Sequence, residues 1–241
     1  MMRHVFAAAC LVLAVPLSAM AQSLSEAELK ALVLDTIREN PEIVMEAVEI
    51  LRAREAEAQA ARAAEVLSSQ RDLLERDPNA PVLGNPDGDV TLVEFFDYNC
   101  GFCKQVFPRV KALIDEDPNL RVVMREWPIL SEGSIEAARL SLAAREQGMY
   151  NEFHDALMAS RGRAGEATAL RIAEDLGLDV DKLKEDAASD VISAHIDTSR
   201  ALSEALGVSG TPAFVIGSEI VPGAIELDDM KALIAQARDA G

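Results

Sequence analysis

The sequence feature that most constrains the fold is a pair of cysteines, Cys100 and Cys103, placed between an apolar run and a helical pattern. Residues 90–96 are apolar at nearly every position, which favours a buried central strand. From Cys103 to about residue 116, apolar residues recur at helical spacing. A thiolate at the start of a helix is stabilised by unpaired N–H groups and by the helix dipole. This order of elements therefore predicts a reactive dithiol on a strand-to-helix turn.

The first 21 residues have the pattern of a cleaved signal peptide. Arg3 supplies a positive start, residues 5–17 form an apolar run too short to span a bilayer, and residues 19–21 form a small-x-small cleavage site. Cleavage there removes Cys10 and leaves one vicinal cysteine pair in the mature chain. One such pair gives no structural disulfide framework, so we expect a chemical role for it and a periplasmic location. An uncleaved membrane anchor is the alternative.

The composition limits the classes of partner. The chain has 241 residues, of which 49% are hydrophobic and 27% are charged, as expected for a soluble globular protein of one or two domains. Its formal net charge of −18 argues against nucleic acid as a partner. The acidic runs are interpreted as solvated surface.

Residues 22–77 are predicted to form an extended helical stalk. Apolar residues recur at helical spacing as far as Leu51, Asn40-Pro41 marks a break, and residues 52–65 are mostly Ala, Glu and Arg. Because a helix rises ~1.5 Å per residue, a helical segment of this length extends beyond a compact core. Its apolar residues then need another partner, and we expect self-association. An amphipathic N-terminal helix on a monomer is the alternative.

Residues 78–241 are predicted to form one α/β domain. Strands at 90–96 and 120–127 flank a helix at 103–116, which makes a right-handed β-α-β unit. Glycines divide a helical insertion, at about 131–207, into several pieces. A hairpin at 213–221 and a last helix from residue 227 complete the domain. This order predicts helices on both faces of a small sheet.

The two cysteines are expected to have different roles. We expect Cys100 to be the exposed nucleophile and Cys103, one helical turn later, to be the buried thiol that resolves a mixed disulfide. A structural zinc site is the alternative, and it needs four ligands. The further candidates after cleavage are His154 and His195, which stand at unrelated spacings in the helical insertion. We therefore expect no metal and interpret both histidines as structural.

Glu94 is the one carboxylate within the apolar strand. Burial of a carboxylate is costly and raises its pKa, which would suit Glu94 to carry protons to and from Cys103. The alternatives are that its side chain reaches solvent, or that it pairs with Lys104 or Lys111.

Thr211-Pro212 directly precedes the strand expected at 213–216. A proline cannot donate a hydrogen bond to a sheet, so it belongs at the start of a strand. Next to an active site, we expect a cis-proline here, with an ordinary trans turn as the alternative.

The chain resembles the DsbA-type branch of the thioredoxin superfamily. Besides the helical insertion, the resemblance rests on three short motifs, which are Glu94-Phe95-Phe96, Cys100-Gly101-Phe102-Cys103 and Thr211-Pro212. It implies a thioredoxin-like fold and a protein-disulfide oxidoreductase that works through a redox-active Cys100–Cys103 disulfide, without another cofactor. In that family the first cysteine attacks and the buried glutamate assists proton transfer, which makes Cys100, Cys103 and Glu94 the expected catalytic residues. The residues expected to contact the client protein are Gly101, Phe102, Thr211 and Pro212.

The helical N-terminal segment is a departure from plain DsbA-type oxidases. In length and pattern it is similar to the ScsC-like (suppressor of copper sensitivity C) periplasmic proteins. That resemblance implies a homotrimer formed through the stalk, a disulfide isomerase or reductase acting on misoxidised, cysteine-containing clients, and a membrane redox partner that reduces it. The alternatives are a monomeric DsbA-like thiol oxidase and a copper-binding or copper-tolerance protein that uses the same thiols.

Overall fold

The computed structural model describes residues 25–240, and the expected signal peptide and Cys10 lie outside this range. A five-stranded mixed sheet with the order β1-β3-β2-β4-β5 forms its centre. β2 and β3 run parallel, and the other neighbouring pairs run antiparallel. The strands are β1 (Val82–Gly84), β2 (Val90–Phe96), β3 (Leu120–Glu126), β4 (Ala213–Ile216) and β5 (Glu219–Pro222). Within this range, none of the helices is both long enough and apolar enough to cross a bilayer.

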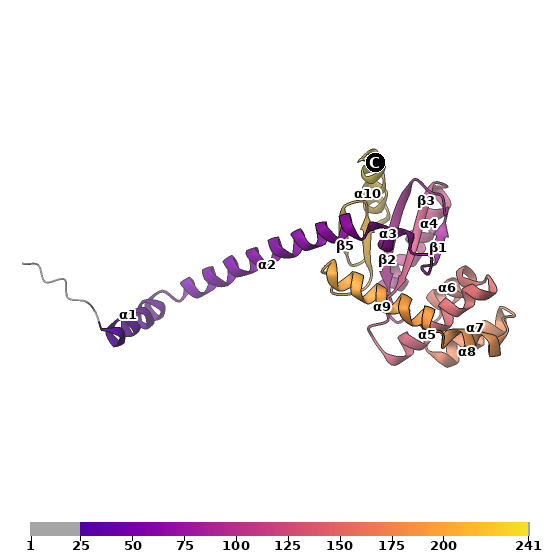
Figure 1. The fold of residues 1–241 in the computed structure, drawn as a ribbon, viewed down its shortest axis with the longest axis horizontal. Helices are drawn as coiled ribbons and strands as arrows, with labels where there is room; N and C mark the ends of the chain where they lie inside the picture. The colour runs from indigo at the N-terminus through magenta and orange to yellow at the C-terminus, as the bar shows by residue number, and fades with distance from the viewer. Residues whose placement is uncertain (1–24, 241) are drawn as a thin grey trace, which may run out of the picture. The chain divides into compact units, whose positions relative to one another are not determined.

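The helices fall before, between and after these strands (Figure 1). Those that precede the sheet are α1 (Glu26–Glu39), α2 (Glu42–Ser69) and α3 (Arg71–Arg76). α4 (Gly101–Glu116) connects β2 to β3, and α10 (Leu227–Ala240) follows β5. The insertion between β3 and β4 consists of α5 (Glu132–Ala144), η1 (Arg145–Gln147), α6 (Tyr150–Ala159), α7 (Glu166–Asp175), α8 (Val180–Ala187) and α9 (Asp190–Ala205).

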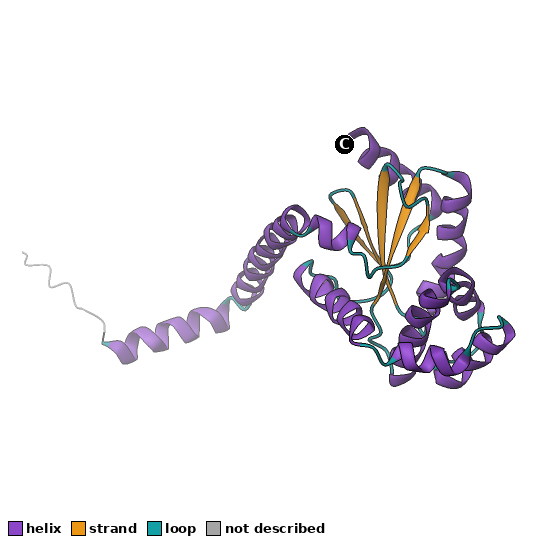
Figure 2. Ribbon diagram, turned by 45° about the vertical axis from the view of Figure 1, so that its right-hand side comes forward, coloured by secondary structure: helices purple, strands orange, loops and turns teal. Residues whose placement is uncertain are grey.

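Helices lie on either side of the sheet (Figure 2). Two separate hydrophobic clusters of buried side chains contact it. Side chains along a strand alternate between its faces, so Leu92 and Phe96 join the first cluster whereas Val93 and Phe95 join the second. The first cluster includes α4, α10 and most of the insertion. The second includes α3, part of α9 and the end of α2. Both faces of β2 are therefore buried, which explains why residues 90–96 are apolar at nearly every position.

Most of the expected elements are observed. The strands expected at 90–96, 120–127 and 213–216, the return strand of the hairpin and the all-helical insertion are all present. The short edge strand β1 was not expected, because its three residues stand among turn-forming residues. It pairs antiparallel with β3 and adds one strand to the predicted sheet.

The chain divides into two compact units, which meet between Arg54 and Glu55. In the first unit, α1 starts with a capping box in which Ser25 and Glu28 exchange side-chain and backbone hydrogen bonds. α1 buries none of its residues, and α2 begins after a break at Asn40. Many large apolar side chains of this unit are exposed, namely Leu29, Leu32, Val33, Leu34, Ile37, Ile43, Val44, Met45, Ile50 and Leu51.

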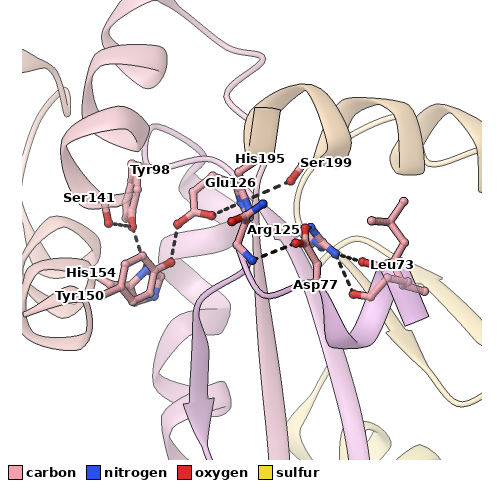
Figure 3. A network of polar contacts seen from close by, with 12 residues as sticks. Leu73, Asp77, Tyr98, Arg125, Glu126, Ser141, Tyr150, His154, His195 and Ser199 are labelled. Atoms are coloured by element: carbon pink, nitrogen blue, oxygen red, sulfur yellow. Dashed lines mark hydrogen bonds and ion pairs between the residues drawn. The ribbon is translucent and has the colours of Figure 1, made fainter. Parts of the chain in front are cut away.

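The second unit begins at Glu55, inside α2, whereas the sequence placed the start of the domain at residue 78. Two leucines explain the difference, since Leu67 of α2 and Leu74 of α3 are buried in the second hydrophobic cluster. The side chain of Arg125 on β3 is fully buried and donates hydrogen bonds to the carbonyls of Leu73 and Leu74 (Figure 3). It also pairs with Asp77 at 2.7 Å. These contacts fix residues 67–77 to the sheet.

Candidate active site

Cys100 occupies the N-cap of α4, at the end of the turn that follows β2. Its backbone is extended, and its N–H donates to the carbonyl of Asp97 at 3.0 Å. The thiol of Cys103, together with a hydrogen bond from the hydroxyl of Thr211 and the N–H groups of Cys103 and Phe102, lowers the pKa of Cys100 to about 5. Burial opposes this shift. A thiol with this pKa is mostly thiolate at neutral pH, which is the nucleophilic form.

The Thr211-Pro212 peptide bond is cis, as the sequence predicts. It lies directly against the first cysteine, because the Sγ of Cys100 is 3.2 Å from the carbonyl oxygen of Thr211. Thr211 therefore contacts this sulfur in two opposed ways: its carbonyl accepts a hydrogen bond from the protonated thiol, and its hydroxyl donates one that stabilises the thiolate. Two segments 111 residues apart in the sequence thus meet at the sulfur.

Cys103 lies behind Cys100, on the first turn of α4. It is 0% exposed, compared with 6% for Cys100, so the expected order of exposure is observed although Cys100 is more covered than we expected. Burial, the hydrogen bond with Cys100 and the nearby Glu94 raise the pKa of the Cys103 thiol far above its usual value. Cys103 therefore keeps its proton until a base removes it.

Glu94 lies on the same face of β2 as Leu92 and Phe96, which is the face that packs against α4. It is 2% exposed. Burial, and to a smaller extent the charge of Cys100, raises its pKa to about 8. Among the described residues, its Oε1 has no hydrogen-bond partner. A buried carboxyl group with this pKa is able to gain or lose a proton near neutral pH.

Neither lysine considered as a partner for Glu94 serves that purpose. The Nζ of Lys104 donates to the carbonyl of Ser160 at 2.8 Å, and Lys111 pairs with Asp155. The alternative in which Glu94 reaches solvent is excluded by its burial.

Gly101 and Phe102, between the cysteines, are both exposed, and the side chain of Phe102 is 64% exposed. Two further apolar side chains are exposed on the connection that follows β3, namely Ile129 and Leu130. Asp97 joins this connection to the cysteine turn. Its Oδ2 accepts hydrogen bonds from the N–H groups of Ile129 and Leu130, at 2.9 and 3.0 Å, while its Oδ1 accepts from the N–H of Asn99.

Asp97 and Asn99 are residues of this site that the sequence reasoning missed. Asp97 is 2% exposed and organises two segments of backbone, as described above. Asn99 contacts the insertion through its side-chain amide. The available signal was their position, since Asp97 and Asn99 stand among the three residues between an apolar strand and Cys100. Their distant partners are 32 to 65 residues away, and no local pattern identifies them.

The two histidines are buried in separate positions of one polar network (Figure 3). The Nδ1 of His154 is 3.0 Å from the hydroxyl of Tyr98, and burial lowers the pKa of His154 to about 3. The Nε2 of His195 is 2.7 Å from Glu126. Neither histidine joins the cysteines in a cluster, and residues 25–240 contain no group of three or more His, Cys, Asp or Glu side chains suited to a metal ion.

This fold and site are those of a thioredoxin-like protein with a dithiol opposite a cis-proline. Residues 91–235 match the family model of the DSBA-like thioredoxin domain, and residues 26–58 match that of the copper resistance protein ScsC N-terminal domain. The chain belongs to the DSBA-like thioredoxin family, whose members are thiol–disulfide oxidoreductases that act on cysteine-containing proteins. The predicted fold class and the resemblance to ScsC-like proteins are thereby confirmed.

Solved structures agree with this assignment. A thioredoxin-like oxidoreductase from Silicibacter pomeroyi is 53% identical, with a TM-score of 0.70 over 71% of this chain and 99% of that chain. A linker-deletion mutant of Proteus mirabilis ScsC is 27% identical, with a TM-score of 0.70 over 92% of this chain and 100% of that one. The thiol-disulfide exchange protein alpha-DsbA2 from Wolbachia pipientis is 30% identical, with a TM-score of 0.68 over 74% and 97% of the two chains.

Curated relatives are similar over part of the chain. A Na(+)/H(+) antiporter NhaA 1 from Salinispora arenicola is 32% identical over 158 residues, which are 65% of this chain and 24% of the antiporter. The chain thus spans about a quarter of the length of the first curated relatives it matches.

Proposed function

We propose that this protein is a periplasmic disulfide isomerase or reductase that corrects misoxidised client proteins through Cys100 and Cys103. The observation that supports the chemistry is the position of the Cys100 sulfur, which lies at the start of α4, against Thr211, with a pKa of about 5. Such a sulfur is available as a thiolate whenever the pair is reduced. No further cofactor enters the proposal.

The first step is a thiol–disulfide exchange. The thiolate of Cys100 attacks one sulfur of a client disulfide and forms a new S–S bond, and the client's other sulfur leaves as a thiolate with the electron pair. In isomerisation, another client thiolate then attacks the client sulfur of the mixed disulfide, and Cys100 leaves as a thiolate. The client changes its pairing, and neither partner undergoes net oxidation.

In reduction, Cys103 completes the reaction instead. Glu94 in its ionised form accepts the Cys103 proton, the Cys103 sulfur attacks the sulfur of Cys100, and the client leaves with both of its cysteines reduced. The protein then holds a Cys100–Cys103 disulfide and requires a dithiol donor, for which we propose a membrane redox partner. The exposed Phe102, with Thr211 and Pro212, is proposed to contact the client beside the reacting sulfur.

The proposal of an isomerase rather than a simple oxidase rests on residues 26–51. Their large apolar side chains are exposed in the single chain, and exposed apolar faces of this extent favour association. We propose that these residues form the stalk of a homotrimer. Three Cys100 sulfurs in one assembly would then act on the same misfolded client. The pattern of residues 1–21 supports export by a signal peptide.

Refolding of scrambled ribonuclease tests this proposal. The comparison uses the mature protein and a variant lacking residues 22–54, which retains the whole of the second compact unit. We expect the mature protein to restore ribonuclease activity, and the variant to reduce insulin disulfides at the same rate per active site without rescuing ribonuclease. Light scattering on both proteins measures the assembly. Full rescue of ribonuclease by a monomeric variant would contradict the trimeric isomerase and favour a monomeric enzyme.

A role in copper tolerance is the second candidate, and the match of residues 26–58 to a copper resistance family favours it. Two adjacent thiols are soft ligands of the kind Cu(I) prefers. Titration with Cu(I) of the reduced protein and of the Cys100→Ala, Cys103→Ala double variant tests it. Binding that is tight and depends on both cysteines would support this role, and equal weak binding by the two proteins would exclude it.

A further inference from the structure

The side chain of Asn99, the residue directly before Cys100, joins the active-site turn to the helical insertion. Its Oδ1 accepts a hydrogen bond from the N–H of Ala164 at 2.8 Å, and its Nδ2 donates to the carbonyl of the same residue at 2.8 Å. The same Nδ2 lies 3.0 Å from the Oγ of Ser134 and 3.4 Å from that of Ser131. One amide group therefore holds the loop before α7 and the first turn of α5.

The first turn of α5 and the loop before α7 also contact each other directly. A Cβ atom on Gly133 would lie only 2.7 Å from the carbonyl oxygen of Ala164, so the contact requires glycine. The Oε2 of Glu136 accepts a hydrogen bond from the N–H of Glu166, at the start of α7. The loop before α7 is thus fixed by α5 on one side and by Asn99 on the other.

A surface pocket of about 480 Å³ lies between the two segments. Its walls are residues 131–136 and residues 163–168. Ser131 and Ala164, which line the pocket, are both within hydrogen-bond distance of the Asn99 side chain. Asn99 and Cys100 are consecutive residues, so the residue directly before the reactive cysteine contacts both walls of this pocket.

We infer that the pocket is a binding subsite for the client chain next to its reacting cysteine, and that Asn99 is the positioning residue that holds the two walls together. This inference rests on the proposed thiol–disulfide exchange. Asn99 does not act on the sulfur itself. The groups that lower the pKa of Cys100 are supplied by Cys103, Thr211 and Phe102, and none of them belongs to the Asn99 side chain.

If the pocket binds the client, its loss should change KM but not kcat. Exchange with a peptide substrate gives both quantities. The substrate is a ten-residue peptide with one central cysteine in a mixed disulfide with glutathione. We compare the mature protein with Asn99→Ala and with Asn151→Ala, an exposed asparagine of α6 that serves as the matched control. Loss of one or two hydrogen bonds that hold a wall should raise the KM of Asn99→Ala about tenfold, with kcat within about twofold of the unchanged protein.

A second variant approaches the same wall from α5. Gly133→Ala places a methyl group against Ala164 and should raise KM in the same way, so it tests the inference even if Asn99→Ala does not fold. The thiolate absorbance at 240 nm gives the pKa of Cys100 in each variant, and we expect it to stay at the wild-type value. An unchanged KM in both variants, or a pKa that moves together with kcat, would overturn the inference. A wild-type protein without exchange activity on the peptide would overturn the proposed function itself.

Discussion

Two helices of similar amphipathic pattern, α1 and α4, have opposite environments in this chain. α4 buries Cys103, Val106, Val110 and Leu113 against the sheet. α1 buries none of its residues, and Leu32 is 55% exposed. The apolar face of α4 is thus covered by the sheet of the same chain, whereas the apolar face of α1 is exposed. The difference suggests a division of roles, in which the second unit carries the sulfur chemistry and the first carries association.

The largest effect is expected from removal of the Cys100 sulfur, which should abolish the chemistry and leave association unchanged. We expect Cys100→Ala to reduce dithiol exchange with insulin to the uncatalysed rate, because Cys103, the other described thiol, is fully buried and its pKa is raised. Its oligomeric mass should stay unchanged, which light scattering checks. Cys103→Ala should instead accumulate mixed disulfides with clients, visible on non-reducing gels. The reverse pattern of trapping would exchange the roles of the two cysteines.

Glu94→Gln should slow the step that uses Cys103. The amide is similar in shape but accepts no proton, so we expect release of the mixed disulfide to slow about a hundredfold, a typical general-base contribution. Attack by Cys100 on a small disulfide should change less, since the Cys100 pKa is set mainly by hydrogen bonds. Stopped-flow fluorescence separates the two steps. Equal slowing of both would show that Glu94 supports the fold of the site rather than proton transfer.

A charge on the open face of α1 should break association while leaving the chemistry intact. Leu32→Glu is expected to shift the oligomer towards monomer and to lower the rescue of scrambled ribonuclease about tenfold, because burying an unpaired carboxylate in an apolar interface is costly. Lys30→Glu, on another part of the same helix, is the matched control. Reduction of insulin should be equal in all three proteins. An intact oligomer in Leu32→Glu would place the contact elsewhere.

The smallest expected effect concerns the pH dependence of the reactivity of Cys100. Since the thiolate is the reactive form, alkylation of Cys100 by iodoacetamide should be constant at neutral pH and fall with a midpoint at about 5. The ordinary midpoint of a thiol is about 8.5. The lowered pKa also stabilises the folded, reduced form fully above about 8.5, and this contribution is lost as the pH falls through about 5. A midpoint near that of an ordinary thiol would contradict the proposed thiolate.

The parts of the fold that follow from local pattern could be predicted from the sequence. The apolar run at 90–96 predicted β2, and the cysteine spacing and Thr211-Pro212 predicted the two segments that meet at the Cys100 sulfur. The alternation of side chains along β2 also explains why Glu94 faces α4. The cysteine pair, Glu94 and Thr211-Pro212 could be recognised as site residues from the sequence, because each is an unusual residue type at its position in the strand or turn.

What could not be predicted depends on contacts distant in sequence. The start of the second unit lies at Glu55 because Leu67 and Leu74 pack on the sheet and Asp77 pairs with Arg125, 48 residues away. Asn99 offered no more than a polar residue before a cysteine, and its role emerges only from Ala164, 65 residues later. Periodicity predicts that a helix has an apolar face, but it does not reveal which surface covers that face.

The placement of both cysteines in one of the two hydrophobic clusters has a consequence for how this protein tolerates change. The sheet works as a partition: the second cluster, around Val93, Phe95 and Val215, contains no sulfur and no part of α4. We expect substitutions at Val93, Phe95 or Val215 to change the stability of the domain more than the pKa values of the thiols. Residues that mainly stabilise the domain and residues that react thus lie on opposite faces of the same sheet.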